Sequence, residues 1–300
     1  MKLYLNKHDR ICFFGDSITA AGLWIAEVFD YFCKNYPSLK IGMYNCGIGG
    51  AKGCEANIKN RMFRECFNYF PKYVVVMFGM NEFSYPEETL SEINTRYENT
   101  LYRITELCNF TGAEPIICSP TPYDEYNDGV EKENIGRDKI LESLFHTARA
   151  FSKKNGFIFV DMRSLLLENM KERPISDDRV HPSEYGAHLM AISFMQAIDE
   201  NFRENPDKKF EMSLKNKKRY ETEQILREYM FIEYTYTNWK SEYEKTIAER
   251  KSLLKEKVTE KSEKWENKIL KTYLKNADFI DERRGELVRL TLGMYSRESK

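Results

Sequence analysis

Short apolar runs alternate with longer amphipathic segments over the first two thirds of the chain. The longer segments, near residues 20–35, 54–68, 87–110 and 131–154, have the spacing of helices. This alternation is typical of a parallel sheet covered by helices on both faces, so we predict an α/β fold with a flavodoxin-like, doubly wound, five-stranded parallel sheet. Its functional site should lie at the carboxyl ends of the strands. The predicted strands are Ile11–Phe14, Ile41–Asn45, Tyr73–Phe78, Glu114–Ser119 and Phe157–Val160.

The pattern changes after residues 201–209. No His or Cys follows, and no Pro or Gly occurs between Pro206 and Gly285, so the tail should be helical. We predict an α/β domain over residues 1–204 and an all-α, charged C-terminal extension over residues 205–300. Apolar residues recur along the tail at steps of four and seven: Trp239, Tyr243, Ile247, Leu254, Val258, Trp265, Ile269 and Tyr273.

Two interpretations of this apolar stripe stay open. It packs on the α/β domain or on neighbouring tail helices, or it forms a dimerisation arm or lid. A homo-oligomer formed through the C-terminal helices is therefore one expected partner. Nothing in the tail has the pattern of a catalytic motif.

Charge and composition narrow the class of partner. The 300 residues carry 46 basic and 47 acidic side chains, so no overall field attracts nucleic acid or an anionic membrane. No apolar run is long enough to span a bilayer, and the first ten residues lack the hydrophobic stretch of a secretory signal. We expect a cytoplasmic protein that acts on a small molecule.

The seven cysteines are odd in number and form no CxxC pair or Cys/His cluster. We expect reduced, mostly buried thiols, with no metal and no organic cofactor. A disulfide framework or a zinc site is the minor alternative.

Candidate chemistry begins at Ser17, which directly follows an apolar run. A serine hydroxyl needs a histidine to take its proton and a carboxylate to orient that histidine; otherwise Ser17 is only a helix N-cap. Of four histidines, His181 lies in a polar loop before a predicted helix that begins near Pro182 with Ser183 as a possible cap. Asp178 precedes His181 by three residues, although Asp177 is a rival.

Four motifs, in order, resemble the consensus blocks of the SGNH (GDSL) hydrolase family. They are GDSIT at Gly15–Thr19, NCGIGG at Asn45–Gly50, GMNE at Gly79–Glu82 and DRVH at Asp178–His181. The resemblance covers roughly residues 8–202. It implies that Ser17 is the nucleophile, His181 the general base and acid, and Asp178 the group that orients His181. It also implies an oxyanion hole made of the backbone N–H groups of Ser17 and Gly50 and the side-chain amide of Asn81.

Other interpretations of these motifs fit less well. Thr19 occupies the last position of a would-be GxSxG elbow, and Lys52 stands where GxGxxG requires a glycine. Asn81 could be only a turn residue, and Asp16 is more readily a structural hydrogen-bonding residue than an acid catalyst. One departure from the family is that Glu82 occupies a position where the third block usually has Asp.

The family implies an ester substrate but does not identify it. Residues 119–129 form a loop rich in Tyr, Asp and Asn, which suits hydroxyl groups, so we expect an acetyl or similar small acyl ester of a carbohydrate or other polar alcohol. The alternatives are a short-chain lipid, lysophospholipid or thioester substrate, an acyltransferase, and a non-catalytic binding or scaffold protein. The expected substrate-binding residues are Trp24, Met80, Phe83 and Tyr123.

Overall fold

The computed structural model describes residues 2–55, 58–82, 88–127, 136–203, 210–217, 219–221 and 224. The chain divides into two compact units, Met1–Gln224 and Ile225–Lys300. The predicted helical tail, with its apolar stripe, falls largely in the second unit and outside the described residues.

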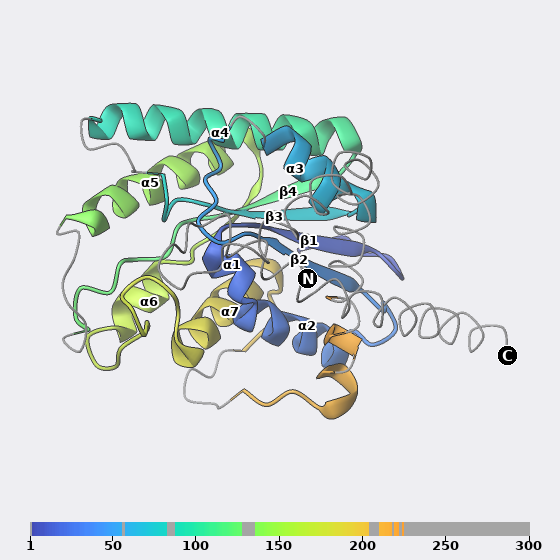
Figure 1. The fold of residues 1–300 in the computed structure, drawn as a ribbon. Helices are drawn as coiled ribbons and strands as arrows, with labels where there is room; N and C mark the ends of the chain where they lie inside the picture. Colours follow the sequence, from blue (N-terminus) through green and yellow to red (C-terminus); the bar gives the residue numbers. More distant parts are fainter. Residues whose placement is uncertain are drawn as a thin grey trace, which may run out of the picture. The chain divides into compact units, whose positions relative to one another are not determined.

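Five parallel strands form the sheet of the first unit, in the order β2-β1-β3-β4-β5 (Figure 1). This is the flavodoxin-like order, so the predicted fold class is confirmed. Apolar runs mark the strands because both faces of the sheet are covered, and β3 is buried along its whole length. The strands are β1 (Arg10–Gly15), β2 (Gly42–Gly47), β3 (Tyr73–Met77), β4 (Glu114–Cys118) and β5 (Ile158–Val160).

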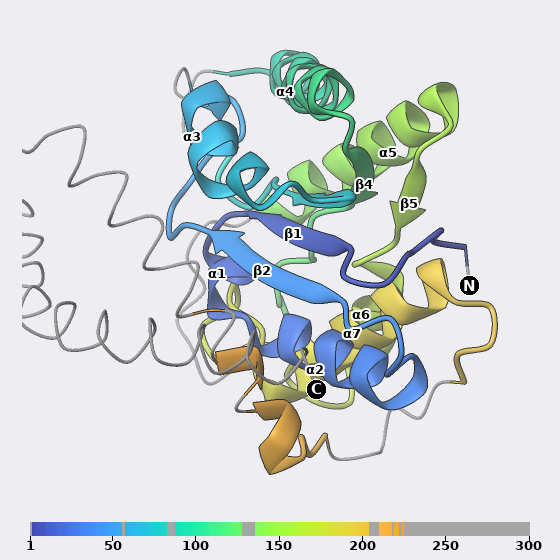
Figure 2. The same cartoon turned by 90° about the vertical axis from the view of Figure 1, so that its right-hand side faces the viewer.

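Helices cover both faces of the sheet (Figures 1 and 2). The helices α3, α4 and α5 lie on one face, and α1, α2, α6 and α7 lie on the other. In addition, a 3-10 turn follows α3. The helices are α1 (Ser17–Ala21), α2 (Leu23–Asn35), α3 (Ile58–Glu65), η1 (Phe67–Tyr69), α4 (Leu90–Thr111), α5 (Arg137–Asn155), α6 (Ser164–Asn169) and α7 (Glu184–Ile198).

The core between the sheet and α2 and α7 is aromatic. Phe13 on β1 lies 5.2 Å, centroid to centroid, from the indole of Trp24 and 5.7 Å from the ring of Phe194. All three side chains are at most 1% exposed. These contacts fix α2 and α7 to the sheet and so hold the residues at both of their N-termini in place.

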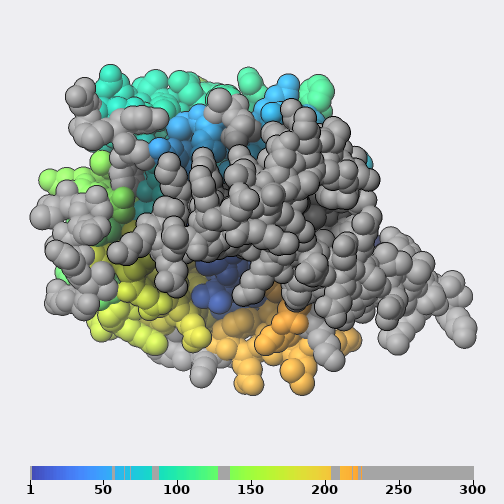
Figure 3. All heavy atoms as spheres, viewed as in Figure 1, coloured from blue at the N-terminus to red at the C-terminus, as the bar shows by residue number. Residues whose placement is uncertain are grey.

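The first unit continues about twenty residues past the predicted boundary at residue 204. Tyr220 packs against Phe29 of α2, and Gln224 hydrogen-bonds to the backbone of Asn45 and Met43. This segment lies along the lower edge of the face shown in Figure 3, opposite α4. The change in composition after residues 201–209 therefore comes before the end of the first compact unit at Gln224. No described helix is long and apolar enough to cross a membrane.

Candidate active site

Three strands end in register at one edge of the sheet. Gly15 at the end of β1 pairs with Gly47 on β2 and with Met77 on β3. Each strand is followed within four residues by a residue from the sequence motifs: Ser17, Gly50 and Asn81. Parallel pairing therefore brings three loops, distant in sequence, to the same edge.

Ser17 is the first residue of α1, and the N-cap is its neighbour Asp16, whose Oδ1 accepts the N–H of Ile18 at 3.0 Å. The helix starts directly against the strand ends. A Cβ on Gly15 would lie 2.1 Å from Thr19 Oγ1, and a Cβ on Gly47 would lie 2.2 Å from the backbone nitrogen of Ala20. Glycine at both positions permits this close approach. The capping interpretation of Ser17 is therefore wrong, because Asp16 fills that role.

His181 joins Ser17 to Asp178 by hydrogen bonds. Its Nε2 lies 2.8 Å from Ser17 Oγ, and its Nδ1 lies 2.6 Å from Asp178 Oδ2. The other carboxylate oxygen of Asp178 accepts the backbone N–H of His181 at 2.6 Å and that of Val180 at 3.0 Å. Between the two alternatives left by the sequence, it is Asp178 and not Asp177 that contacts the imidazole.

The turn that carries this pair is fixed by buried contacts. Arg179 has a left-handed backbone (φ 72°) and is buried, and its guanidinium donates to the carbonyl of Asp124 at 2.8 Å. The carboxylate of Asp124 accepts the N–H of Ile175 at 3.1 Å. A non-glycine residue in this conformation costs free energy that surrounding contacts must offset. Sequence reasoning missed both residues, although Arg179 lies within the DRVH motif.

Asp178 is ionised over the whole physiological range. Partial burial would raise its pKa, but the hydrogen bonds from the ring and backbone of His181 and from Val180 outweigh burial and lower the pKa to about 2. A permanently charged carboxylate on Nδ1 favours the tautomer that presents Nε2 to Ser17 as a proton acceptor.

The two other predicted loops place N–H donors at this edge. Gly50 has φ +70°, the left-handed region that favours glycine, and it is exposed. The side-chain amide of Asn81 is partly exposed and donates to the carbonyl of Ala51 at 3.1 Å. Asn81 and Gly50 therefore belong to loops that are joined by a hydrogen bond.

Two carboxylates are buried beside these donors. Burial raises the pKa of Asp16 to about 7; the charge of Glu82 adds to this rise, and the hydrogen bond from the Ile18 N–H opposes it. Burial also raises the pKa of Glu82, against the hydrogen bond from the Gly53 N–H. Within the described part of the chain, neither carboxylate forms a hydrogen bond with the side chains of Ser17, His181 or Asp178.

Three of the four expected substrate-binding side chains are buried. Trp24, Met80 and Tyr123 are 1%, 2% and 3% exposed and belong to the hydrophobic core. Their burial gives the substrate-binding role of these three residues no support, and that role stays a prediction. Most of the 119–127 loop is likewise buried. Phe83 lies outside the described residues.

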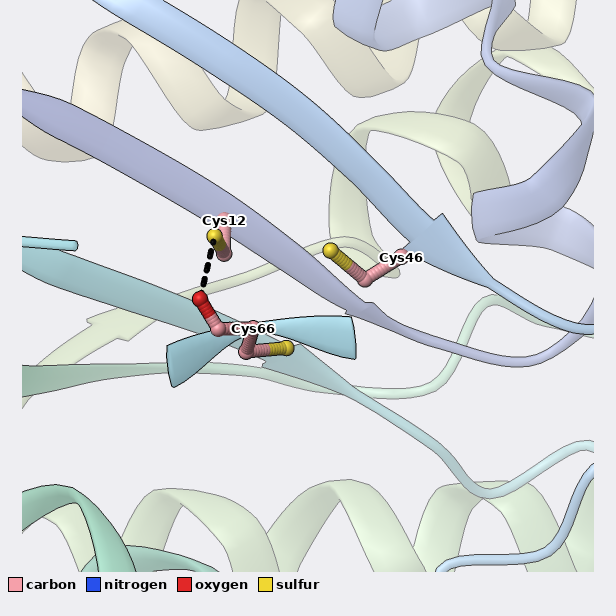
Figure 4. Close-up of side chains that lie close together, drawn as sticks. All are labelled: Cys12, Cys46 and Cys66. Atoms are coloured by element: carbon pink, nitrogen blue, oxygen red, sulfur yellow. Dashed lines mark hydrogen bonds between the residues drawn. The ribbon is translucent and has the colours of Figure 1, made fainter. Parts of the chain in front are cut away.

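Three buried cysteine sulfurs, from Cys12, Cys46 and Cys66, lie within 4.8 Å of one another between β1, β2 and the end of α3 (Figure 4). Burial raises the pKa of the Cys12 and Cys66 thiols well above the usual range. The thiols of Cys12 and Cys46 donate to backbone carbonyls of Cys66 and Glu65. Burial of all three side chains and the two hydrogen bonds to backbone carbonyls are typical of core packing, and we assign the trio to that role. All seven cysteines are free thiols.

Solved structures with the same fold include two enzymes of nearly the same length as the α/β domain. Axe2, an acetylxylan esterase from Geobacillus stearothermophilus, is 24% identical, with a TM-score of 0.56 over 68% of this chain and 98% of its own. LAE5, an alpha/beta hydrolase from the metagenome of Lake Arreo, Spain, is 21% identical, with a TM-score of 0.55 over 65% of this chain and 97% of its own.

A longer protein shares the fold as well. A gut microbial diltiazem-metabolizing enzyme is 22% identical, with a TM-score of 0.54 over 66% of this chain, which spans only 48% of that enzyme. No curated protein matches the sequence. The family model "GDSL-like Lipase/Acylhydrolase" matches residues 11–194, more than half of the chain. The chain therefore belongs to the GDSL-like lipase/acylhydrolase family and is a carboxylic ester hydrolase.

Proposed function

We propose that the protein is a serine esterase that removes a small acyl group, most simply acetyl, from a carbohydrate or a related polar alcohol. The observation that carries the mechanism is the unbroken hydrogen-bond chain from Ser17 Oγ through His181 to Asp178. A serine, a histidine and a carboxylate in this order are the parts that acyl transfer requires.

In the proposed reaction, Ser17 Oγ attacks the ester carbonyl carbon while His181 Nε2 accepts its proton. The carbonyl oxygen becomes an oxyanion, which accepts hydrogen bonds from the backbone N–H groups of Ser17 and Gly50 and from the amide of Asn81. His181 then protonates the leaving alcohol. Water, deprotonated by His181, attacks the acyl-enzyme and releases the acid, and the proton returns to Ser17. Asp178 stabilises the imidazolium that forms in both halves.

The choice of substrate has narrower support. Axe2 is described as an acetylxylan esterase and shares the fold at nearly its full length. The burial of Trp24 and Tyr123 gives the choice of a sugar no support. The proposal of a small acyl group on a sugar therefore follows the likeness to Axe2.

The test compares 4-nitrophenyl acetate with 4-nitrophenyl octanoate and then measures acetate release from acetylated xylo-oligosaccharides. Wild type should prefer the acetyl ester, and Ser17→Ala should lose turnover while keeping its circular dichroism spectrum and melting temperature. A fluorophosphonate probe should label wild type at Ser17 alone. Faster cleavage of octanoate would overturn the acyl preference and favour a lipid ester. Undiminished hydrolysis by Ser17→Ala would overturn the mechanism.

Two further arms separate the remaining alternatives. Adding an acceptor sugar and analysing the products distinguishes hydrolysis from transfer, since a transferase would yield the acylated acceptor in place of acetate. A protein that fails to react with the fluorophosphonate and cleaves no ester would instead be a binding or scaffold protein.

A further inference from the structure

Glu82 stands directly after Asn81 and turns its carboxylate into the protein. Its side chain is 1% exposed, and Oε1 accepts the backbone N–H of Gly53 at 2.6 Å. Oε2 is buried and makes no hydrogen bond within the described part of the chain. The thiol of Cys54, the residue after Gly53, is a second hydrogen-bond partner of this carboxylate. A carboxylate is costly to bury, so both partners that offset this cost come from the loop after β2.

The backbone at Glu82 is itself held in place. The guanidinium of Arg96 on α4 donates to the carbonyl of Glu82, and the Glu82 N–H donates to the carbonyl of Gly79 at 3.2 Å. The carboxylate therefore projects from a fixed point. Its position is set by Arg96 on α4 and by the turn that starts at Gly79, after the end of β3.

Two adjacent side chains reach the same short segment of the loop after β2. Asn81 donates to the carbonyl of Ala51, and Glu82 accepts from the N–H of Gly53, so residues 51–53 are fixed at both ends. Gly50, the proposed backbone donor to the oxyanion, comes immediately before this segment. Gly53 also packs closely: a Cβ there would lie 2.5 Å from Thr100 Cγ2.

We propose that Glu82 is a positioning residue that holds the Gly50 loop against Asn81, so that the backbone and side-chain donors converge on one oxyanion. The inference rests on the proposed acyl-transfer function of Ser17. A donor held in place before the reaction stabilises the developing charge without reorganisation during the step, which is what makes an oxyanion hole effective.

The length of the side chain is the basis of this proposal. An Asp side chain at position 82 is shorter by one C–C bond, about 1.5 Å. The distance from its oxygen to the Gly53 nitrogen, which is 2.6 Å for Glu82, would then exceed the hydrogen-bonding range. Gln would keep both the reach and an acceptor oxygen but remove the charge. Reach and charge can thus be separated with two variants.

The experiment compares Glu82→Asp, Glu82→Gln and a matched control, Glu65→Asp, which shortens another buried carboxylate whose partner is Arg61. Kinetics on 4-nitrophenyl acetate and hydrogen exchange of peptides covering residues 48–55 are measured for each. Glu82→Asp should lower kcat about tenfold or more, with KM within about twofold, since a displaced donor acts mainly on the transition state. Glu82→Gln should keep kcat within about threefold of wild type, and Glu65→Asp should keep both constants.

Exchange decides the question even without turnover. In Glu82→Asp, amide exchange at Gly53 should speed up at least tenfold, whereas Glu82→Gln should retain protection. Unchanged exchange or unchanged kcat in Glu82→Asp would overturn the proposed positioning role of Glu82. An equal loss of kcat in both Glu82 variants would overturn it as well. Absence of Ser17-dependent hydrolysis in wild type, with the exchange pattern as expected, would count against the proposed function alone.

Discussion

Two aspartates that lie either side of the nucleophile show opposite behaviour. Asp178 is about half exposed and has its pKa lowered to about 2, whereas Asp16 is 2% exposed and has its pKa raised to about 7. Both carboxylates accept a backbone N–H within a tight turn. The same chemical group is thus permanently charged in one place and only half ionised near pH 7 in the other.

The number of donors and the degree of burial explain this contrast. Asp178 receives the imidazole and two backbone N–H groups, which together outweigh the cost of its partial burial. At Asp16, burial outweighs the hydrogen bonds from the backbone of Ile18 and of Asp16 itself, and the charge of Glu82 adds to the rise in pKa. Environments that separate the pKa values of neighbouring carboxylates also separate their roles. Asp178 suits charge stabilisation, and Asp16 suits structure.

The largest expected effect is on kcat, and it comes from neutralising the exposed Asp178. Asp178→Asn should lower kcat about 10⁴-fold, because an amide can donate to Nδ1 and so favour the tautomer whose Nε2 cannot accept the Ser17 proton. Steady-state hydrolysis of 4-nitrophenyl acetate measures this. Asp177→Asn, one residue earlier and without contact to the ring, is the matched control and should keep wild-type kcat. An equal loss of kcat in the two variants would show that the negative charge of the turn matters and that contact with the imidazole does not.

The second largest effect is on the free energy of unfolding, and it comes from replacing the buried Asp16. Asp16 has a folded pKa of about 7 against 3.8 when unfolded, so the folded state holds the proton more tightly and wild type loses stability as pH rises between these values. Asp16→Asn keeps the cap acceptor and removes this loss. Its free energy of unfolding should therefore gain about 3 kcal/mol relative to wild type between pH 5 and pH 8.

Urea unfolding of both proteins at the two pH values measures that gain. Asp199→Asn is a control of opposite sign: Asp199 is buried too, but hydrogen bonds from Tyr36, Asn201 and Tyr31 outweigh burial and lower its pKa. The stability that its charge contributes is lost only as the pH falls below about 3.8, so Asp199→Asn should cost the same at pH 8 and pH 5 and less at about pH 2. A pH-independent difference between wild type and Asp16→Asn would mean that Asp16 is charged throughout.

The smallest effect is the response to salt. Asp178 and His181 are 51% and 46% exposed, so 1 M NaCl should screen their attraction and raise the pKa of Asp178 by a few tenths. The pKa of Asp16, which depends first on burial, should hardly move. Titration of ¹³C-labelled aspartate by NMR at low and high salt follows both carboxyl groups. A larger salt shift at Asp16 than at Asp178 would reverse the comparison.

Local patterns in the sequence were sufficient for most of the fold. Each predicted strand overlaps an observed one and differs at its ends by no more than two residues, because a strand buried on both faces must be continuously apolar. Ser183 caps α7 as expected, its Oγ accepting the Gly186 N–H. The short helix α1 was missed, since five residues give too little periodicity to detect.

Side-chain burial was much harder to predict. Trp24 and Tyr123 are of residue types that suit sugar stacking, yet both are in the core, because which face of an element turns inward depends on its partners. The apolar tail stripe and Phe83 lie outside the described residues, so the predictions for them stand as made.

The sequence by itself determined which residues follow which strands. It also determined that the family motifs contain Ser17, Gly50, Asn81, Asp178 and His181. Only the tertiary structure decided that Asp178 rather than Asp177 meets the imidazole, that Asp16 caps α1, and that Glu82 reaches Gly53. The physical reason is that motifs record local chemistry, whereas hydrogen-bond partners and pKa values depend on groups brought together from distant parts of the chain.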